Sequence, residues 1–164
     1  MTGDVLVVGY GNTLRTDDGV GRLAAERLAD DPRLDGVRVI GRHQLTPEIA
    51  LDVSRAALVV FVDASRRSPA GIVTVEPMER TGRHRAGWSH YLDPHSLLDL
   101  TGELYGRVPD AFLVSVGVES VLPGDRLSPM VEACLPGLVD AVAELIADHA
   151  ARPRIVSVAD RRHA

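Results

Sequence analysis

The stretch VVGYGNTLRTDDGVGRLAAERL, residues 7–28, passes from a predicted strand through a glycine-containing turn into a predicted helix. Its first residues are apolar and mostly β-branched, which favours a strand, and apolar residues recur at helical spacing after the turn. A strand, a glycine turn and a helix in this order are typical of domains that bind a phosphate group at the helix N-terminus. This turn, however, carries two adjacent carboxylates, Asp17 and Asp18, which would repel a phosphate group.

The rest of the chain continues the alternation of strand and helix. Five apolar segments predict strands, at residues 4–10, 36–42, 57–64, 71–77 and 111–118. Helices are predicted after the two acids, at 46–56, at 93–104 and after residue 128, with Thr46 and Ser128 as N-caps. This order predicts one α/β domain over residues 1–150, with a twisted, mostly parallel sheet of about five strands between helices. Residues 151–164 carry four Arg against one Asp and predict a basic, flexible tail.

Composition limits the classes of protein to which the chain can belong. A chain of 164 residues with 45% apolar content can bury a core. Its 18 basic and 23 acidic residues give a net charge of −5, which argues against nucleic-acid binding. No apolar run approaches the roughly 18 residues that cross a bilayer, and the first residues lack the basic region of a signal peptide. The single cysteine, Cys134, suits a reducing compartment. We expect a cytoplasmic monomer that binds neither nucleic acid nor membrane.

Carboxylates follow two of the predicted buried strands. Asp63 comes directly after the run LVVFV, and Asp17 and Asp18 follow the first strand and its turn. Because the carboxyl ends of parallel strands share one edge of a sheet, we expect these groups to lie near one another. Their combined negative charge predicts a bound cation. Each acid also has a simpler explanation, since acids in a first helical turn complement the helix dipole and Asp63 could cap a helix.

Histidine supplies the other expected ligand type. His95 lies beside Pro94, which predicts a helix start, and is the main candidate; His43, just after the second strand, is a secondary one. Carboxylates and imidazole together suit a borderline divalent ion such as nickel or zinc. Weaker signals come from the remaining histidines, His84, His90, His149 and His163.

The sequence lacks the motifs of nucleotide-binding sites and of common hydrolase active sites. A dinucleotide-binding turn would have a third glycine where Leu14 stands, and the sequence contains no GK[ST] of a P-loop. It also lacks the GxSxG turn of serine hydrolases and the HExxH motif of zinc proteases. A small nucleotide-binding domain, resting on Gly9 and Gly11, stays as an alternative hypothesis.

Four blocks of the sequence resemble the hydrogenase maturation proteases, the endopeptidases that finish the large subunit of [NiFe] hydrogenases. The blocks are VVGYGNTLRTDDGVG (7–21), LVVFVDAS (58–65), DPHSLLDL (93–100) and LVSVGVES with LSPMVEACLPGL (113–120 and 127–138). The first is the most specific, because it matches the family pattern G-x-G-N-x-L-x-x-D-[DE]-x-x-G. The resemblance spans about residues 4–147, and the order and rough spacing of the blocks agree.

The resemblance implies an α/β fold and an activity. Such a protease recognises nickel already installed in the large-subunit precursor and then cuts off a C-terminal extension. The implied metal ligands are Asp18, Asp63 and His95, with Asp18 and Asp63 as the catalytic groups. The nickel would come from the precursor, and zinc or cadmium could occupy the same ligands. Hydrolysis could use a metal-activated water or one of the two carboxylates as a general base, and the sequence leaves both mechanisms open.

One block departs from the family pattern. Many members carry an Asp-Gly-Gly-Thr-like loop after the second strand, where this chain has RHQLTPE (42–48). The change leaves the metal ligands in place but bears on the identity of the substrate, and His43 becomes a possible extra ligand or substrate contact. It also motivates a second hypothesis, a non-catalytic metal- or precursor-binding maturation factor on the same fold.

Overall fold

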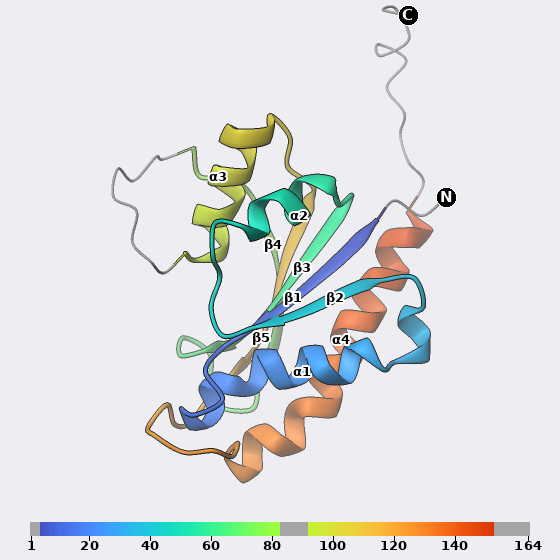
Figure 1. Ribbon diagram of the computed structural model, residues 1–164. Helices are drawn as coiled ribbons and strands as arrows, with labels where there is room; N and C mark the ends of the chain where they lie inside the picture. Colours follow the sequence, from blue (N-terminus) through green and yellow to red (C-terminus); the bar gives the residue numbers. More distant parts are fainter. Residues whose placement is uncertain (1–3, 83–91, 153–164) are drawn as a thin grey trace, which may run out of the picture.

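A computed structural model describes residues 4–82 and 92–152 of the chain (Figure 1). The five predicted strands are all present, as β1 (Val5–Tyr10), β2 (Arg38–Arg42), β3 (Leu58–Ser65), β4 (Val73–Met78) and β5 (Asp110–Gly117). So are the four predicted helices, α1 (Val20–Ala29), α2 (Ile49–Arg55), α3 (Pro94–Tyr105) and α4 (Pro129–Ala151). Two short 3-10 helices, η1 (Thr16–Gly19) and η2 (Pro32–Leu34), precede α1 and β2. The α/β prediction is therefore confirmed.

The sheet has the order β2-β1-β3-β5-β4. Strands β2, β1, β3 and β5 pair in parallel, and β4 pairs antiparallel with β5 at one edge. The chain runs from β1 outward to β2, and then returns to the other side of β1 to form β3. The connections that leave the neighbouring parallel strands β1 and β3 thus run toward opposite edges of the sheet. In open α/β sheets, ligands bind outside the carboxyl ends of two strands whose connections diverge in this way.

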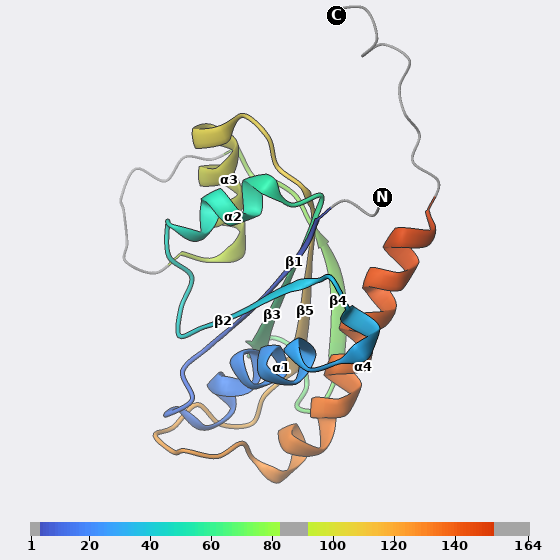
Figure 2. The same ribbon diagram turned by 45° about the vertical axis from the view of Figure 1, so that its right-hand side comes forward.

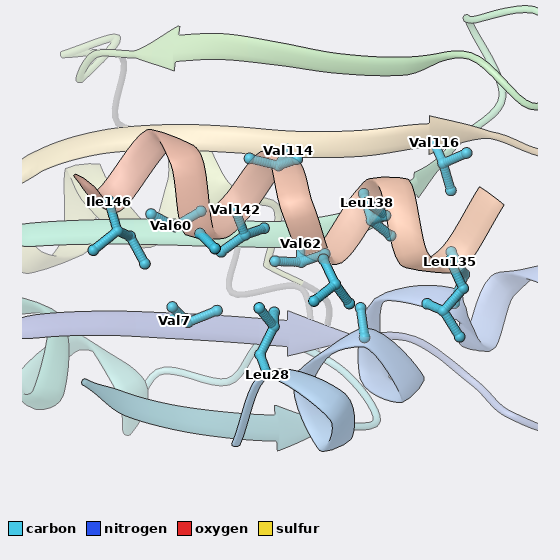
Figure 3. Packing of buried hydrophobic residues seen from close by; sticks show 14 of the residues in the cluster. Val7, Leu28, Val60, Val62, Val114, Val116, Leu135, Leu138, Val142 and Ile146 are labelled. Atoms are coloured by element: carbon cyan, nitrogen blue, oxygen red, sulfur yellow. The ribbon is translucent and has the colours of Figure 1, made fainter. Parts of the chain in front are cut away.

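Helices cover both faces of the sheet, α1 and α4 on one and α2 and α3 on the other (Figures 1 and 2). The alternating side chains of the strands build a separate core on each face. Val7 of β1 and Val60 of β3 pack with Leu138 and Val142 of α4, as Figure 3 shows. Leu6 and Phe61, one position along each strand, pack on the opposite face under α2 and α3. These two cores hold the carboxyl ends of β1 and β3 in a fixed position.

Of the two predicted helix caps, Thr46 is wrong, and Ser128 is confirmed in position but not as a side-chain cap. Helix α2 begins at Ile49 rather than near Thr46, whose carbonyl accepts a hydrogen bond from the Ile49 N–H in a preceding turn. Ser128 occupies the N-cap position of α4 but makes no side-chain cap, because its hydroxyl donates to Asp17 instead. Asp93 does cap α3, where its carboxylate accepts from the Ser96 N–H.

Several sequence-based predictions fall outside the described residues. They include His84, His90 and His163, and nearly all of the predicted tail, since the described part of the chain ends at Arg152, one residue after α4. Within residues 4–82 and 92–152, no helix combines the length and the apolar character that a membrane span requires.

Candidate functional site

The glycine turn after β1 allows the start of α1 to lie directly against the strands. A Cβ atom on Gly9 would come within 2.1 Å of the Gly21 carbonyl oxygen, and one on Gly21 within 2.2 Å of the Val62 carbonyl oxygen. Gly11 has φ +144°, which other residues rarely adopt. These glycines resemble those of a nucleotide-binding turn, but here they allow the backbone of η1 and α1 to pack closely against the ends of β1 and β3.

The two adjacent acids of η1 have different environments. The side chain of Asp17 is fully buried and turned into the protein. Its Oδ2 accepts hydrogen bonds from the Glu119 and Ser120 N–H groups, both at 3.1 Å, and from the Ser128 hydroxyl at 2.9 Å. Its Oδ1 accepts from the Ser128 N–H at 2.6 Å. Four donors occupy this carboxylate, so Asp17 joins η1 to the segment before α4 and is not available to a ligand.

Asp18 faces the other way, into an open cleft. Its Oδ2 accepts a hydrogen bond from the Asn12 N–H at 2.9 Å, which fixes the carboxylate relative to the glycine turn. Asn12 in turn accepts from the Leu14 N–H through its side-chain oxygen, so the turn is held by its own residues. The sequence could not choose between the two acids, and the structure leaves Asp18 as the one that can meet a ligand.

Asp63 lies near the carboxyl end of β3 and lines the same cleft. Its Oδ1 accepts from the Ala64 N–H and its Oδ2 from the Tyr10 hydroxyl, each at 2.7 Å. Burial raises the pKa of Asp63 to about 6; the two hydrogen bonds oppose this shift, and the nearby negative charge of Asp18 adds to it. A carboxyl group with this pKa can take up or release a proton near neutral pH.

The cleft opens at the carboxyl ends of β1 and β3, where the connections lead in opposite directions across the sheet. Its volume is about 310 Å³. The lining residues come from β1 and its turn, the loop after β2, β3 and the segment before α3: Tyr10, Gly11, Asn12, Arg15, Asp18, His43, Gln44, Leu45, Asp63 and Leu92. The predicted meeting of Asp18 and Asp63 at one edge of the sheet is therefore observed.

The two candidate histidines lie in different places. His43 is exposed and lines the cleft, whereas His95, the second residue of α3, is not among its lining residues. The Nδ1 of His95 lies 3.0 Å from the Glu79 carbonyl oxygen. A ligand role for His95 stays a prediction, and it requires the imidazole to reach the cleft from this position. In the described part of the chain, no three His, Cys, Asp or Glu side chains are grouped closely enough to hold a metal ion.

Tyr10 and Arg15 line the cleft and were missed by the sequence analysis. Arg15 is held at the rim, where its Nε donates to the Val121 carbonyl oxygen at 3.2 Å. Tyr10, the last residue of β1, reaches across to Asp63. Its position offered a signal, because a phenol at the end of a buried strand falls at the same sheet edge as the acids.

The cleft is suited to proton transfer and to binding a cation. No serine, threonine or cysteine is among its lining residues, so the described residues supply no hydroxyl or thiol nucleophile other than the phenol of Tyr10. Asp18 and Asp63 offer two carboxylates, one of them with its pKa raised toward neutrality. Such a pair can activate a water molecule or hold part of the coordination sphere of a divalent ion.

Hydrogenase maturation peptidases share this fold. The hydrogenase 2 maturation peptidase of a Thaumarchaeota archaeon is 28% identical, with a TM-score of 0.67, over 88% of this chain and 98% of that one. The hydrogenase maturating endopeptidase HybD of E. coli is 25% identical, with a TM-score of 0.70, over 89% and 93%. The [NiFe] hydrogenase maturation protease HycI of Thermococcus kodakarensis, 24% identical over 88% and 93%, has the same fold at a TM-score of 0.68. No protein-family model and no curated protein matches the chain.

The fold that carries the carboxylate-lined cleft of this chain is, in these solved structures, the fold of a peptidase. The protein is accordingly a hydrolase. More narrowly, the solved structures that share this fold with the chain over nearly its whole described length are hydrogenase maturation peptidases.

Proposed function

We propose that the protein is an endopeptidase that removes the C-terminal extension of a nickel-loaded [NiFe] hydrogenase large-subunit precursor. The observation that carries this proposal is the cleft in which Asp18 and Asp63 meet at the carboxyl ends of β1 and β3. The structural neighbours are named as maturation peptidases, and the first sequence block matches their family pattern. The precursor, rather than a peptide in general, is the substrate that this likeness implies.

Nickel enters this proposal as part of the substrate. A resident metal ion needs a full set of ligands from the protein, and the described residues do not group three such side chains. A metal already bound within a precursor needs fewer additional ligands, and Asp18 and Asp63 offer two carboxylates for it. In this proposal the negative charge at the glycine turn serves to meet a cation delivered by another protein.

The chemistry that we assign to this chain is positioning and proton transfer. Asp63, whose raised pKa lies near neutrality, accepts a proton from the water that attacks the scissile peptide bond. Asp18, fixed by the Asn12 N–H, holds the substrate's cation beside it. A metal ion at this place supplies positive charge that polarises the peptide carbonyl. Returning the proton to the leaving amine completes the hydrolysis.

We expect incubation with this protein to shorten the nickel-loaded precursor by one discrete C-terminal peptide, and to leave the nickel-free precursor unchanged. The measurement is the intact mass of both precursors before and after incubation. The precursor should be shown competent by its cleavage with an unrelated protease. An unchanged mass of a competent, loaded precursor that still binds the protein would favour the non-catalytic maturation factor.

The two histidines can be separated by substitution. The resemblance implies His95 as a ligand, whereas His43 is the histidine that lines the cleft and His95 contacts Glu79. If catalysis uses the cleft in this conformation, His43→Ala should lower the cleavage rate about 10-fold or more and His95→Ala should change it less than about 3-fold. The measurement is the initial rate of tail removal from the loaded precursor, with unfolding midpoints compared to exclude misfolding. Loss of cleavage in His95→Ala alone would instead support the ligand set Asp18, Asp63 and His95, with the start of α3 moving toward the cleft.

A further inference from the structure

Tyr10 connects the two strands that form the cleft. It is the last residue of β1, and its hydroxyl donates to Oδ2 of Asp63 on β3 at a distance of 2.7 Å. Its ring is partly buried and packs against the core beneath α2 and α3. Burial, and then the Asp63 carboxylate, raise the pKa of Tyr10 well above its ordinary range, so the phenol stays protonated.

This hydrogen bond acts on the orientation of the Asp63 carboxylate. The Ala64 N–H, from the neighbouring residue, holds Oδ1, but this local contact alone leaves the side chain free to exchange between rotamers. The Tyr10 hydroxyl holds Oδ2 from a different strand, so that two donors in different directions keep the Asp63 side chain in one rotamer about Cα–Cβ and fix its carboxylate plane. Each oxygen accepts one of these hydrogen bonds and keeps a second lone pair, and Asp63 lines the cleft.

The hydroxyl has no comparable use in packing. Phenylalanine would fill the same apolar contacts in the core, and the described part of the chain gives the hydroxyl a hydrogen bond to Asp63 alone. The role that these contacts leave for the phenol oxygen is therefore to orient the Asp63 carboxylate.

We propose that Tyr10 is a positioning residue, which holds the Asp63 carboxylate in the single orientation that meets the substrate in the cleft. The proposal rests on the proposed function for its effect on catalysis, but the orientation itself is a property of the protein alone. Tyr10 and Asp63 thus form a hydrogen-bonded pair that links β1 to β3.

The test is Tyr10→Phe, which removes one oxygen atom, with Tyr105→Phe as the matched control. Tyr105 is the exposed last residue of α3 and does not line the cleft. The first readout is the kinetics of tail removal. We expect kcat to fall about 10- to 100-fold in Tyr10→Phe with KM within about twofold of wild type, because the substrate-binding residues are unchanged. Tyr105→Phe should match wild type.

The second readout does not depend on activity. Three-bond couplings between Hα and Hβ of Asp63, measured by NMR, report whether its side chain keeps one rotamer. We expect one rotamer in wild type and in Tyr105→Phe, and averaged couplings in Tyr10→Phe. A single Asp63 rotamer in Tyr10→Phe, or an unchanged kcat, would overturn the proposal. If wild type fails to cleave any loaded precursor, the proposed function fails, and the couplings alone decide whether Tyr10 holds Asp63.

Discussion

Asp63→Asn is expected to abolish cleavage and to make the protein more stable at neutral pH. The carboxylate is kept at a place where burial and the charge of Asp18 disfavour its ionised form. Asparagine has nearly the same shape, its oxygen can still accept from the Ala64 N–H, and it carries no charge. Loss of the proton-accepting group should lower the cleavage rate by at least about 100-fold. Activity and stability should thus change in opposite directions.

The stability gain should depend on pH in a defined direction. Burial raises the pKa of Asp63 from 3.8 to about 6, so between these values the folded protein holds a proton that the unfolded chain has lost. The free energy of unfolding of the wild type therefore falls as the pH rises through this window. At pH 8 the full cost of the ionised group is present. The Asp63→Asn substitution removes this cost and should raise the free energy of unfolding by about 1–3 kcal/mol at pH 8, and by much less near pH 4.

Urea unfolding of both proteins at several pH values between 4 and 8, with a chelator present to remove metal ions, measures this difference. Asp35→Asn is the matched control, because Asp35 is an exposed residue in the turn before β2. It should change neither the cleavage rate nor the pH dependence. A stability gain of equal size at pH 4 and pH 8, or a loss of stability at pH 8, would contradict the assigned cost of ionising Asp63.

The fold could be predicted because its signals are local. Each strand buried on both faces is an apolar run rich in valine, as in LVVFV before Asp63. Segments with helical spacing of apolar residues lie between most of the strands. The rule that the carboxyl ends of parallel strands share an edge then predicts that Asp63 lies near the adjacent acids Asp17 and Asp18. Asp18 and Asp63 do line one cleft, whereas Asp17 is turned away from it.

The parts of the site that depend on long-range contacts could not be predicted. Adjacent acids look equivalent in a sequence, and only the segment around Ser128, more than a hundred residues later, distinguishes Asp17 from Asp18. Ser128 itself looked like a helix cap, but a buried carboxylate without other charge compensation competes for its hydroxyl. The candidate ligand His95 was chosen because the adjacent Pro94 predicts a helix start. That signal does not indicate whether the His95 side chain reaches the cleft.

Asp17→Ala is expected to be among the most destabilising single substitutions in the chain. The carboxylate of Asp17 is fully buried and accepts hydrogen bonds from three backbone N–H groups and one hydroxyl. Alanine would leave these donors without their partner around a fully buried position, and would open a small cavity. Removing one side of a buried charged network costs about 3–5 kcal/mol. The segment around Ser120 and Ser128 would lose its attachment to η1.

The substitution of the adjacent acid, Asp18→Ala, is the control for this prediction, because it removes a carboxylate that faces the cleft. Asp18 accepts one hydrogen bond, from the Asn12 N–H, and faces the cleft, so its loss should cost about 1 kcal/mol of stability while cleavage disappears. Asp17→Asn, which keeps one acceptor oxygen, should fall between the two and provides a folded variant if Asp17→Ala does not fold. Chemical unfolding of the three variants, together with hydrogen exchange at the Glu119, Ser120 and Ser128 amides, makes the comparison. Equal loss of stability from Asp17→Ala and Asp18→Ala would show that the two acids do not divide anchoring and ligand binding between them.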